Sequence, residues 1–197
     1  MREIISNLRT EIVESEDGAK RYSLRKVWDE SKPSMAVVMM CPSSSGEVAV
    51  DTSTGLVLSN CYRLGYGSVT IVNLFATIND FYLKHSTSDD TENMEAILKA
   101  AEAAACVVFA AGTGKQKNKL FAEVQEKTLL ALRPYGDKLH CLCDKNGGSK
   151  HLHPLSPRVR EWHLAPLSIS ELVDIPQEEE KPKKGKDKVS AKKQQNQ

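Results

Sequence analysis

Four continuous apolar stretches recur along the chain at fairly regular intervals. They run from Ser34 to Cys41, from Ser68 to Phe75, from Cys106 to Ala111 and from Lys138 to Cys143. Such runs are typical of strands that are buried on both faces of a sheet. Amphipathic segments separate them, so the pattern predicts parallel strands joined by helical crossovers.

Helices are predicted between these strands over residues 53–64, 91–105 and 118–132. Gly65 is placed to end the first helix as its C-cap, and Asp90 is among the residues that offer an N-cap to the second. An N-terminal β-hairpin is predicted over residues 10–28, where two alternating segments flank the turn dipeptide Asp17-Gly18.

These elements predict an α/β fold, a three-layer α/β/α sandwich around a four-stranded parallel sheet in the order 2-1-3-4. The N-terminal hairpin is expected to extend or cover this sheet. Residues 1–174 are expected to form a single α/β domain, because 197 residues suffice for one domain and a tail. Residues 175–197 are rich in lysine and almost free of apolar side chains, so a disordered tail is predicted there.

Charge sets limits on function. The formal net charge is only +1, so the whole protein is not a general electrostatic binder of nucleic acid. The lysines of the tail would attract phosphates, and a purely solubilising tail is the equally weighted alternative. No apolar run approaches the roughly 20 residues of a membrane span, so no contact with a membrane is expected.

The five cysteines indicate reduced thiols and a cytoplasmic location, because their number is odd and no signal peptide precedes them. Cys141 and Cys143 are spaced so that both fall on one face of a strand. A zinc site would need a second pair of ligands, so buried thiols are the favoured interpretation, and no metal or cofactor is expected.

Polar and glycine residues follow the carboxyl ends of the predicted strands, where ligands bind in open parallel sheets. These residues are Cys41, Pro42, Ser43 and Ser44, then Asn73, then Gly112 and Thr113, and finally His153. Each is a weak signal alone, since each also suits a strand end, a tight turn or a rigid corner. The glycines match neither a Walker loop nor a dinucleotide-binding fingerprint.

Their order resembles that of uracil-DNA glycosylases, in which G-Q-D-P-Y or G-x-N-P-G, L-L-L-N, V-F-L-L-W-G and H-P-S-P follow successive strands. The corresponding segments here are Met40–Ser44, Ile71–Leu74, Val107–Gly112 and Leu152–Pro157. The resemblance covers most of residues 34–157 and implies a uracil-DNA glycosylase-like fold.

A closer resemblance covers more of the chain. A large bacterial and phage family, domain of unknown function 1643, carries R-Y-x-L-x-x-x-W, L-N-P-S, G-Y-G, V-N-L-F-A, W-G and H-P-L. The matching segments are Arg21–Trp28, Met40–Ser43, Gly65–Gly67, Val72–Ala76, Ala111–Gly112 and His153–Leu155. This family brings no established activity with it.

The glycosylase resemblance implies particular roles. Asn73 would read the edge of a base, because an amide offers both a donor and an acceptor. His153 would stabilise the anionic base as it leaves. Phe75 is a candidate stacking face, although a core aromatic is the favoured alternative. The remaining candidate contacts are Pro42, Ser43, Ser44, Gly112 and Thr113 for the base or nucleotide, and Lys115, Lys117 and Lys119 for nucleic-acid phosphates.

One residue departs from the glycosylase pattern. The position before the proline, which holds Asp or Asn in glycosylases, is Cys41 here. A thiol is a weak hydrogen-bonding group and does not orient water as a carboxylate does. Cys41 as a nucleophile paired with His153 is an alternative, less favoured than a small residue that fills the site.

The motif segments also lack the tryptophan of the third glycosylase motif, and only Leu155 offers a wedge between bases. We therefore expect a protein that binds a nucleobase, a nucleotide or DNA through a glycosylase-like pocket. The first alternative is an active N-glycosidase that acts on an unusual or modified base. The second is a module that binds a protein through the same pocket.

Overall fold

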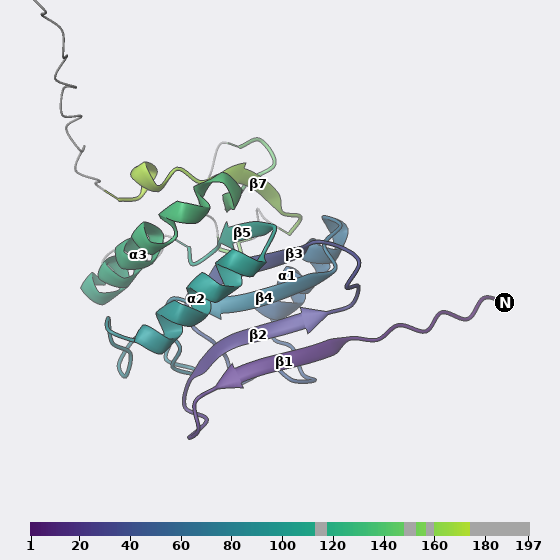
Figure 1. The fold of residues 1–197 in the computed structure, drawn as a ribbon, viewed down its shortest axis with the longest axis horizontal. Coiled ribbons are helices and arrows are strands. Elements are labelled where there is room, and N and C mark those ends of the chain that lie inside the picture. The colour runs from purple at the N-terminus through teal and green to yellow at the C-terminus, as the bar shows by residue number, and fades with distance from the viewer. Residues whose placement is uncertain (113–117, 148–152, 157–159, 174–197) are drawn as a thin grey trace, which may run out of the picture.

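The computed structural model describes residues 1–112, 118–147, 153–156 and 160–173. Seven strands form one mixed sheet in the order β1-β2-β4-β3-β5-β6-β7, as Figure 1 shows for most of them. The strands are β1 (Arg9–Glu14), β2 (Arg21–Val27), β3 (Ser34–Met39), β4 (Ser68–Asn73), β5 (Cys106–Phe109), β6 (Leu139–Cys143) and β7 (His163–Pro166).

The four central strands are parallel and follow the predicted order, since β4-β3-β5-β6 corresponds to 2-1-3-4. The predicted number of strands is wrong, because the sheet has seven. The N-terminal hairpin extends the sheet through antiparallel pairing of β2 with β4. At the other edge, β7 pairs antiparallel with β6. It has only four residues and no alternating apolar pattern, so its sequence does not identify it as a strand.

Three helices connect the parallel strands, and a side chain caps the start of each. Of these caps, Asp90 agrees with the prediction. Asp51, Asp90 and Asn118 each accept a hydrogen bond from a backbone N–H in the first turn of the helix that follows. The helices are α1 (Thr52–Arg63), α2 (Thr91–Ala103) and α3 (Lys119–Ala131). In the described part of the chain, no helix has the length and apolar character to cross a membrane.

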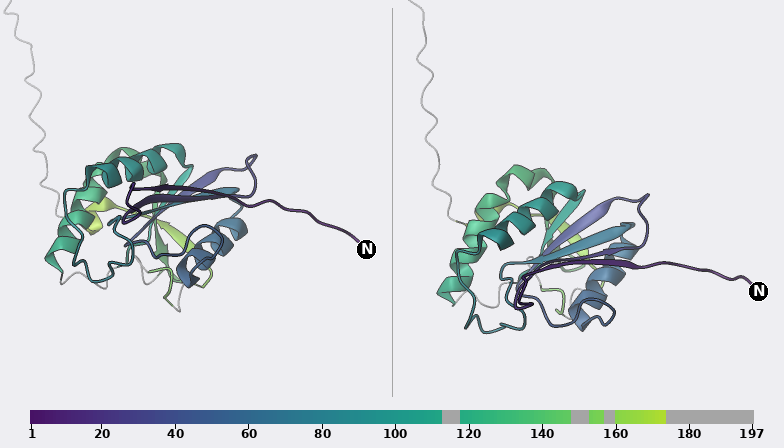
Figure 2. Two further views of the ribbon diagram at one scale, coloured as in Figure 1. Left: turned by 90° about the horizontal axis from the view of Figure 1, so that it is seen from below. Right: turned by 60° about the horizontal axis from the view of Figure 1, so that its bottom comes forward.

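The helices cover both faces of the sheet, which makes three layers. Figure 2 shows α1 on one face, with α2 and α3 on the other. Side chains of β3 alternate between the two cores: Ala36 and Val38 pack with residues of α2 and α3, whereas Val37 packs with Val57 of α1. This alternation explains why the strand is apolar along its whole length. The predicted disordered tail, residues 175–197, lies outside the described residues.

Candidate functional site at the carboxyl edge of the parallel strands

Parallel register brings the predicted site segments to one edge of the sheet. Met39, near the end of β3, is paired with Asn73 at the end of β4, and Val38 is paired with Phe109 at the end of β5. The segments that follow β3, β4 and β5 therefore leave the sheet at the same edge.

Hydrogen bonds fix the loop after β3. The Ser43 hydroxyl donates to the Asp51 carboxylate, which also accepts from the backbone N–H of Thr54 at 2.7 Å. Burial alone would raise the pKa of Asp51, but the hydrogen bonds from Ser43 and the helix lower it overall. The loop is thus tied to the first turn of α1, and Pro42 within it is buried.

The same loop is also fastened to the segment after β4. The backbone N–H of Ser44 donates to Asn79 Oδ1 at 3.1 Å, and the backbone N–H of Asn79 donates to the Pro42 carbonyl at 2.8 Å. Asn79 has a φ of 61°, a left-handed conformation that asparagine tolerates better than most residues. Cys41 is half-buried and packs against the core shared with α2 and α3.

Asn73 is almost completely buried, with 2% of its surface exposed. Asn93 of α2 holds this strand end by donating from Nδ2 to the carbonyls of Asn73 and Leu74, at 2.9 and 3.1 Å. Within the described ranges, the hydrogen bonds of Asn73 run through its backbone, and its side-chain amide has no partner. Phe75 is also 2% exposed and lies in the hydrophobic core, which agrees with the favoured interpretation of this ring as a core aromatic.

Gly112 and His153 meet, although they are 41 positions apart in the sequence. A Cβ added to Gly112 would lie 3.3 Å from His153 Cβ and 3.5 Å from His153 Cδ2. Gly112 also has a φ of 78°, in the region that strongly favours glycine. Glycine is therefore needed both for the turn after β5 and for the approach of the imidazole.

One backbone group determines the tautomer of His153. The N–H of Leu155 donates to His153 Nδ1 at 3.1 Å, so Nδ1 is an acceptor. Burial lowers the pKa of His153 below its ordinary value of 6.5, which favours the neutral ring at neutral pH. A neutral imidazole that accepts at Nδ1 carries its proton on Nε2. Among the described residues Nε2 has no partner, so it is available to donate to a ligand.

The pH dependence of stability tests this burial. Because the folded-state pKa of His153 is lowered, its contribution to stability is present above the unfolded pKa of about 6.5 and is lost as the pH falls through the folded value. Between pH 7.5 and 5, His153→Asn should therefore lose less stability than the wild type. Urea titrations at several pH values measure this difference. Parallel stability curves for the two proteins would contradict it.

Several predicted contacts fall outside the described residues, namely Thr113, Lys115 and Lys117. Lys119 is exposed at the first position of α3. The described contacts thus form two groups, the loop of Pro42–Ser44 with Asn79, and Gly112 with His153. The supporting groups Asn79 and Asn93 are not evident from sequence, because each acts through tertiary contacts, whereas Asp51 acts locally as the N-cap of α1.

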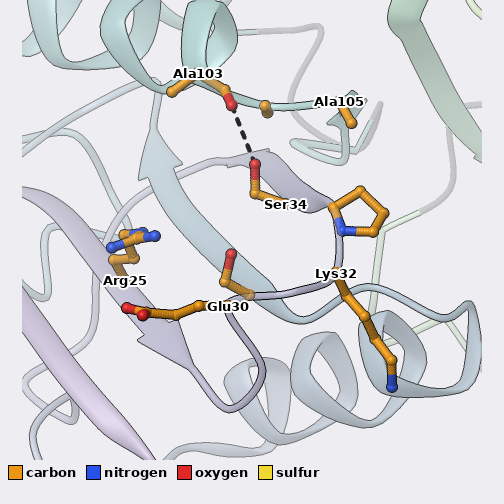
Figure 3. A pocket seen from close by; sticks show the side chains of 9 residues that line it. Arg25, Glu30, Lys32, Ser34, Ala103 and Ala105 are labelled. Atoms are coloured by element: carbon orange, nitrogen blue, oxygen red, sulfur yellow. Dashed lines mark hydrogen bonds between the residues drawn. The ribbon is translucent and has the colours of Figure 1, made fainter.

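A separate hollow lies at the opposite edge of the parallel strands, where β3 and β4 begin (Figure 3). It has a volume of about 510 Å³, and its rim includes Arg25, Glu30 and Lys32. All three form ion pairs: Arg25 with Glu11 at 2.9 Å, Glu30 with Arg9 at 2.6 Å, and Lys32 with Asp29 at 3.2 Å. The charged side chains of this hollow are therefore already neutralised by other side chains of the protein, and they do not need a ligand as a partner.

The cysteines do not form disulfides, and four of the five are buried. Cys141 and Cys143 are 0% and 5% exposed, which agrees with their interpretation as buried thiols. Across the described residues, no cluster of three or more histidine, cysteine or acidic side chains is arranged to hold a metal ion.

Comparison with known proteins identifies one relationship. No curated protein and no solved structure matches the chain. One family does match, over residues 21–155. This range runs from the start of β2 to Leu155, whose N–H donates to His153. The match covers more than half of the 197 residues. The chain therefore belongs to the family described as "Protein of unknown function (DUF1643)".

Proposed function

We propose that the protein binds a nucleobase or a nucleotide, free or within DNA, at the carboxyl edge of its parallel strands. The observation that carries this proposal is the neutral His153, whose Nδ1 is occupied by the Leu155 N–H while its Nε2–H is free of described partners. A fixed neutral donor of this kind suits a carbonyl oxygen of a base, and it suits a cation poorly.

Asn73 supports the same proposal. Its side-chain amide has no hydrogen-bond partner among the described residues, and an amide offers both a donor and an acceptor to a ligand. The edge of a base presents both groups side by side. Asn73 stands at the end of β4, one strand from the β3 loop and two from β5.

The finer architecture that we propose is glycosylase-like. It is supported by the order of the four parallel strands and by the order of the motifs that follow them. Leu155, next to the His153-Pro corner, has 49% of its surface exposed and could enter a base stack. Cys41 stands where a glycosylase positions water, so we favour binding of the base over its hydrolysis.

Asn73→Ala should weaken the binding of a nucleobase or nucleotide by about 1–3 kcal/mol, or roughly 5- to 150-fold, because partners on the base lose their hydrogen bonds. Isothermal titration calorimetry with uracil, uridine monophosphate and short single-stranded DNA measures this loss. Asn7→Ala, in the exposed N-terminal segment, is the matched control and should bind as the wild type does. Equal affinities of the Asn73 variant and the wild type would refute the role of Asn73, and failure of the wild type to bind any of these ligands at millimolar concentration would refute the proposed function.

A further inference from the structure

Two buried cations lie under the loop after β3, and the binding proposal uses neither of them. Arg21 is 4% exposed and Lys26 is 1% exposed. Lysine and arginine are rarely buried to this extent unless they are paired with an opposite charge. Yet neither forms an ion pair with any carboxylate of the described residues.

Both cations instead donate to backbone carbonyls of that loop. Arg21 Nη1 donates to the Ser45 carbonyl, and Lys26 Nζ donates to the Glu47 carbonyl and to Thr10 Oγ1, the latter at 2.8 Å. Three bonds to neutral oxygens compensate two buried charges only in part. The site therefore retains positive charge that the described residues do not neutralise by direct pairing.

One edge of the Arg21 guanidinium, formed by Nε and Nη2, has no hydrogen-bond partner among the described residues. Its Nε is buried without a hydrogen-bond partner, and among the described residues Nη2 has none either. The Nε–H and one Nη2–H of a guanidinium point in the same direction and form the fork that takes two oxygens of an oxyanion. Because Nη1 is held by Ser45, this fork is fixed in place.

A hollow of about 550 Å³ adjoins this arginine. Its walls include Arg21 of β2, Glu14 of β1, and Ser44, Ser45 and Gly46 of the loop. A Cβ on Gly46 would lie only 2.6 Å from Arg21 Nη1, so glycine at this position allows the loop to close over the guanidinium. Two serines beside the arginine add hydroxyl donors, which also suit an anion.

Acidic groups surround the site, but they do not occupy the fork. Glu14 and Asp51 act on Arg21 only at a distance, and Glu47 acts in the same way on Lys26. Asp51 is engaged by Ser43 and by the first turn of α1. Burial lowers the pKa of both Arg21 and Lys26, which agrees with cations that lack a bonded counter-charge.

We infer that Arg21 binds a phosphate group in the hollow between the N-terminal hairpin and the Ser43–Glu47 loop. This inference deepens the proposed function, since the hollow shares Ser44 with the proposed base-binding loop. The phosphate would be that of a nucleotide or of a nucleic-acid backbone. Arg21 is the first residue of the R-Y-x-L motif of the family. The proposed base-binding site gives this motif no role.

Inorganic phosphate is the probe for the test, titrated by calorimetry into the full chain against chloride at equal ionic strength. The wild type should bind phosphate, and Arg21→Met should bind it at least about tenfold more weakly, because charge-assisted hydrogen bonds are lost. Arg25→Gln is the matched control, since Arg25 lies on the same strand and is paired with Glu11. It should bind phosphate as the wild type does.

Gly46→Ala provides a second variant that keeps the cation but displaces the guanidinium, and it should lose a similar amount of phosphate affinity if Arg21→Met fails to fold. A wild type that does not distinguish phosphate from chloride would overturn the inference. So would a folded Arg21→Met or Gly46→Ala that retains wild-type affinity for phosphate.

The ligands separate this inference from the proposed function. Binding of phosphate without any binding of uracil or uridine would support the Arg21 site and refute the base-binding function. Binding of uridine without binding of phosphate would do the reverse. Competition with phosphate by uridine monophosphate supports a free nucleotide as the source of the phosphate, whereas competition by single-stranded DNA alone supports the nucleic-acid backbone.

Discussion

Replacing Gly67 with alanine should lower the free energy of unfolding by about 3 kcal/mol, because the added methyl group has no space. A Cβ at this position would lie 1.8 Å from the carbonyl oxygen of Asp29 and 2.8 Å from the Cβ of Lys32. The first of these neighbours is backbone, so it cannot rotate away as the end of a side chain would.

The hydrogen bonds of this segment add to the cost. The Gly67 carbonyl accepts from the N–H groups of Trp28 and Asp29 at 3.0 and 2.9 Å, and the Gly67 N–H donates to the Pro33 carbonyl at 2.9 Å. Any shift that accommodates the methyl group must strain these bonds, which join β2, β3 and β4 at their connections. Urea denaturation followed by circular dichroism measures the effect.

Gly55→Ala is the matched control and should have the opposite sign. Gly55 lies within α1, and a Cβ added there would meet nothing within 4 Å. Alanine in a helix interior is about 0.5–1 kcal/mol more stable than glycine, so this variant should gain stability. If Gly67→Ala were as stable as the wild type, the close approach of Gly67 to Asp29 would be wrong.

The central part of the fold could be predicted because local chemistry determines it. The four apolar runs fall on β3, β4, β5 and β6, and their crossover helices begin at side chains that cap them. Gly65 ends α1 with a φ of 86°, as its C-cap position predicts. These signals are contained in short segments, so the sequence displays them directly.

The edges of the sheet depend on contacts that no short segment contains. β7 becomes a strand because β6 offers it an unpaired edge, and its pairing of His163 with Cys143 spans 20 positions of the chain. The count of four strands is wrong because β7 and both strands of the hairpin also join the sheet. Likewise, the alternating pattern of residues 10–28 predicted a hairpin but left open whether it would extend or cover the sheet.

The candidate site also has features that could be predicted from the sequence and features that could not. Topology explains why Asn73 and the loops that contain Cys41 and Gly112 leave one edge of the sheet, and this could be predicted from the order of strands. The tautomer of His153 could not be predicted, since it depends on the Leu155 N–H, and neither could the burial of Arg21. Arginine on an alternating hairpin strand normally suggests an exposed charge, and only the loop that folds over it reverses this expectation.

Wild-type protein should release no free uracil from single-stranded DNA, whereas Cys41→Asp should release it at a rate roughly a hundredfold above the wild-type background. Cys41 lies two residues beyond the end of β3 and beside Pro42. In the glycosylase-like architecture that we propose, this position would hold the attacking water. A carboxylate accepts strong hydrogen bonds from water, while a thiol is a weak partner. Cys41→Asn should give a smaller gain, because an amide is a weaker acceptor than a carboxylate.

His153 provides the second half of this experiment. Its Nε2–H would donate to the base as negative charge develops, so its effect belongs to the transition state more than to binding. In the Cys41→Asp background, His153→Ala should therefore abolish release, and the weakening of uracil binding that accompanies it should be much the smaller effect. Mass spectrometry of the released base measures turnover, and calorimetry measures affinity.

Cys41→Ser separates the two possible roles of the thiol. If Cys41 only fills the site, the serine variant should be as inactive as the wild type, since a hydroxyl does not supply the carboxylate. Robust release of uracil by the wild type would overturn the view that the protein binds a base without hydrolysing it. Loss of that release in Cys41→Ser would then identify the thiol as the nucleophile, because serine retains the size of the side chain and removes the more reactive sulfur.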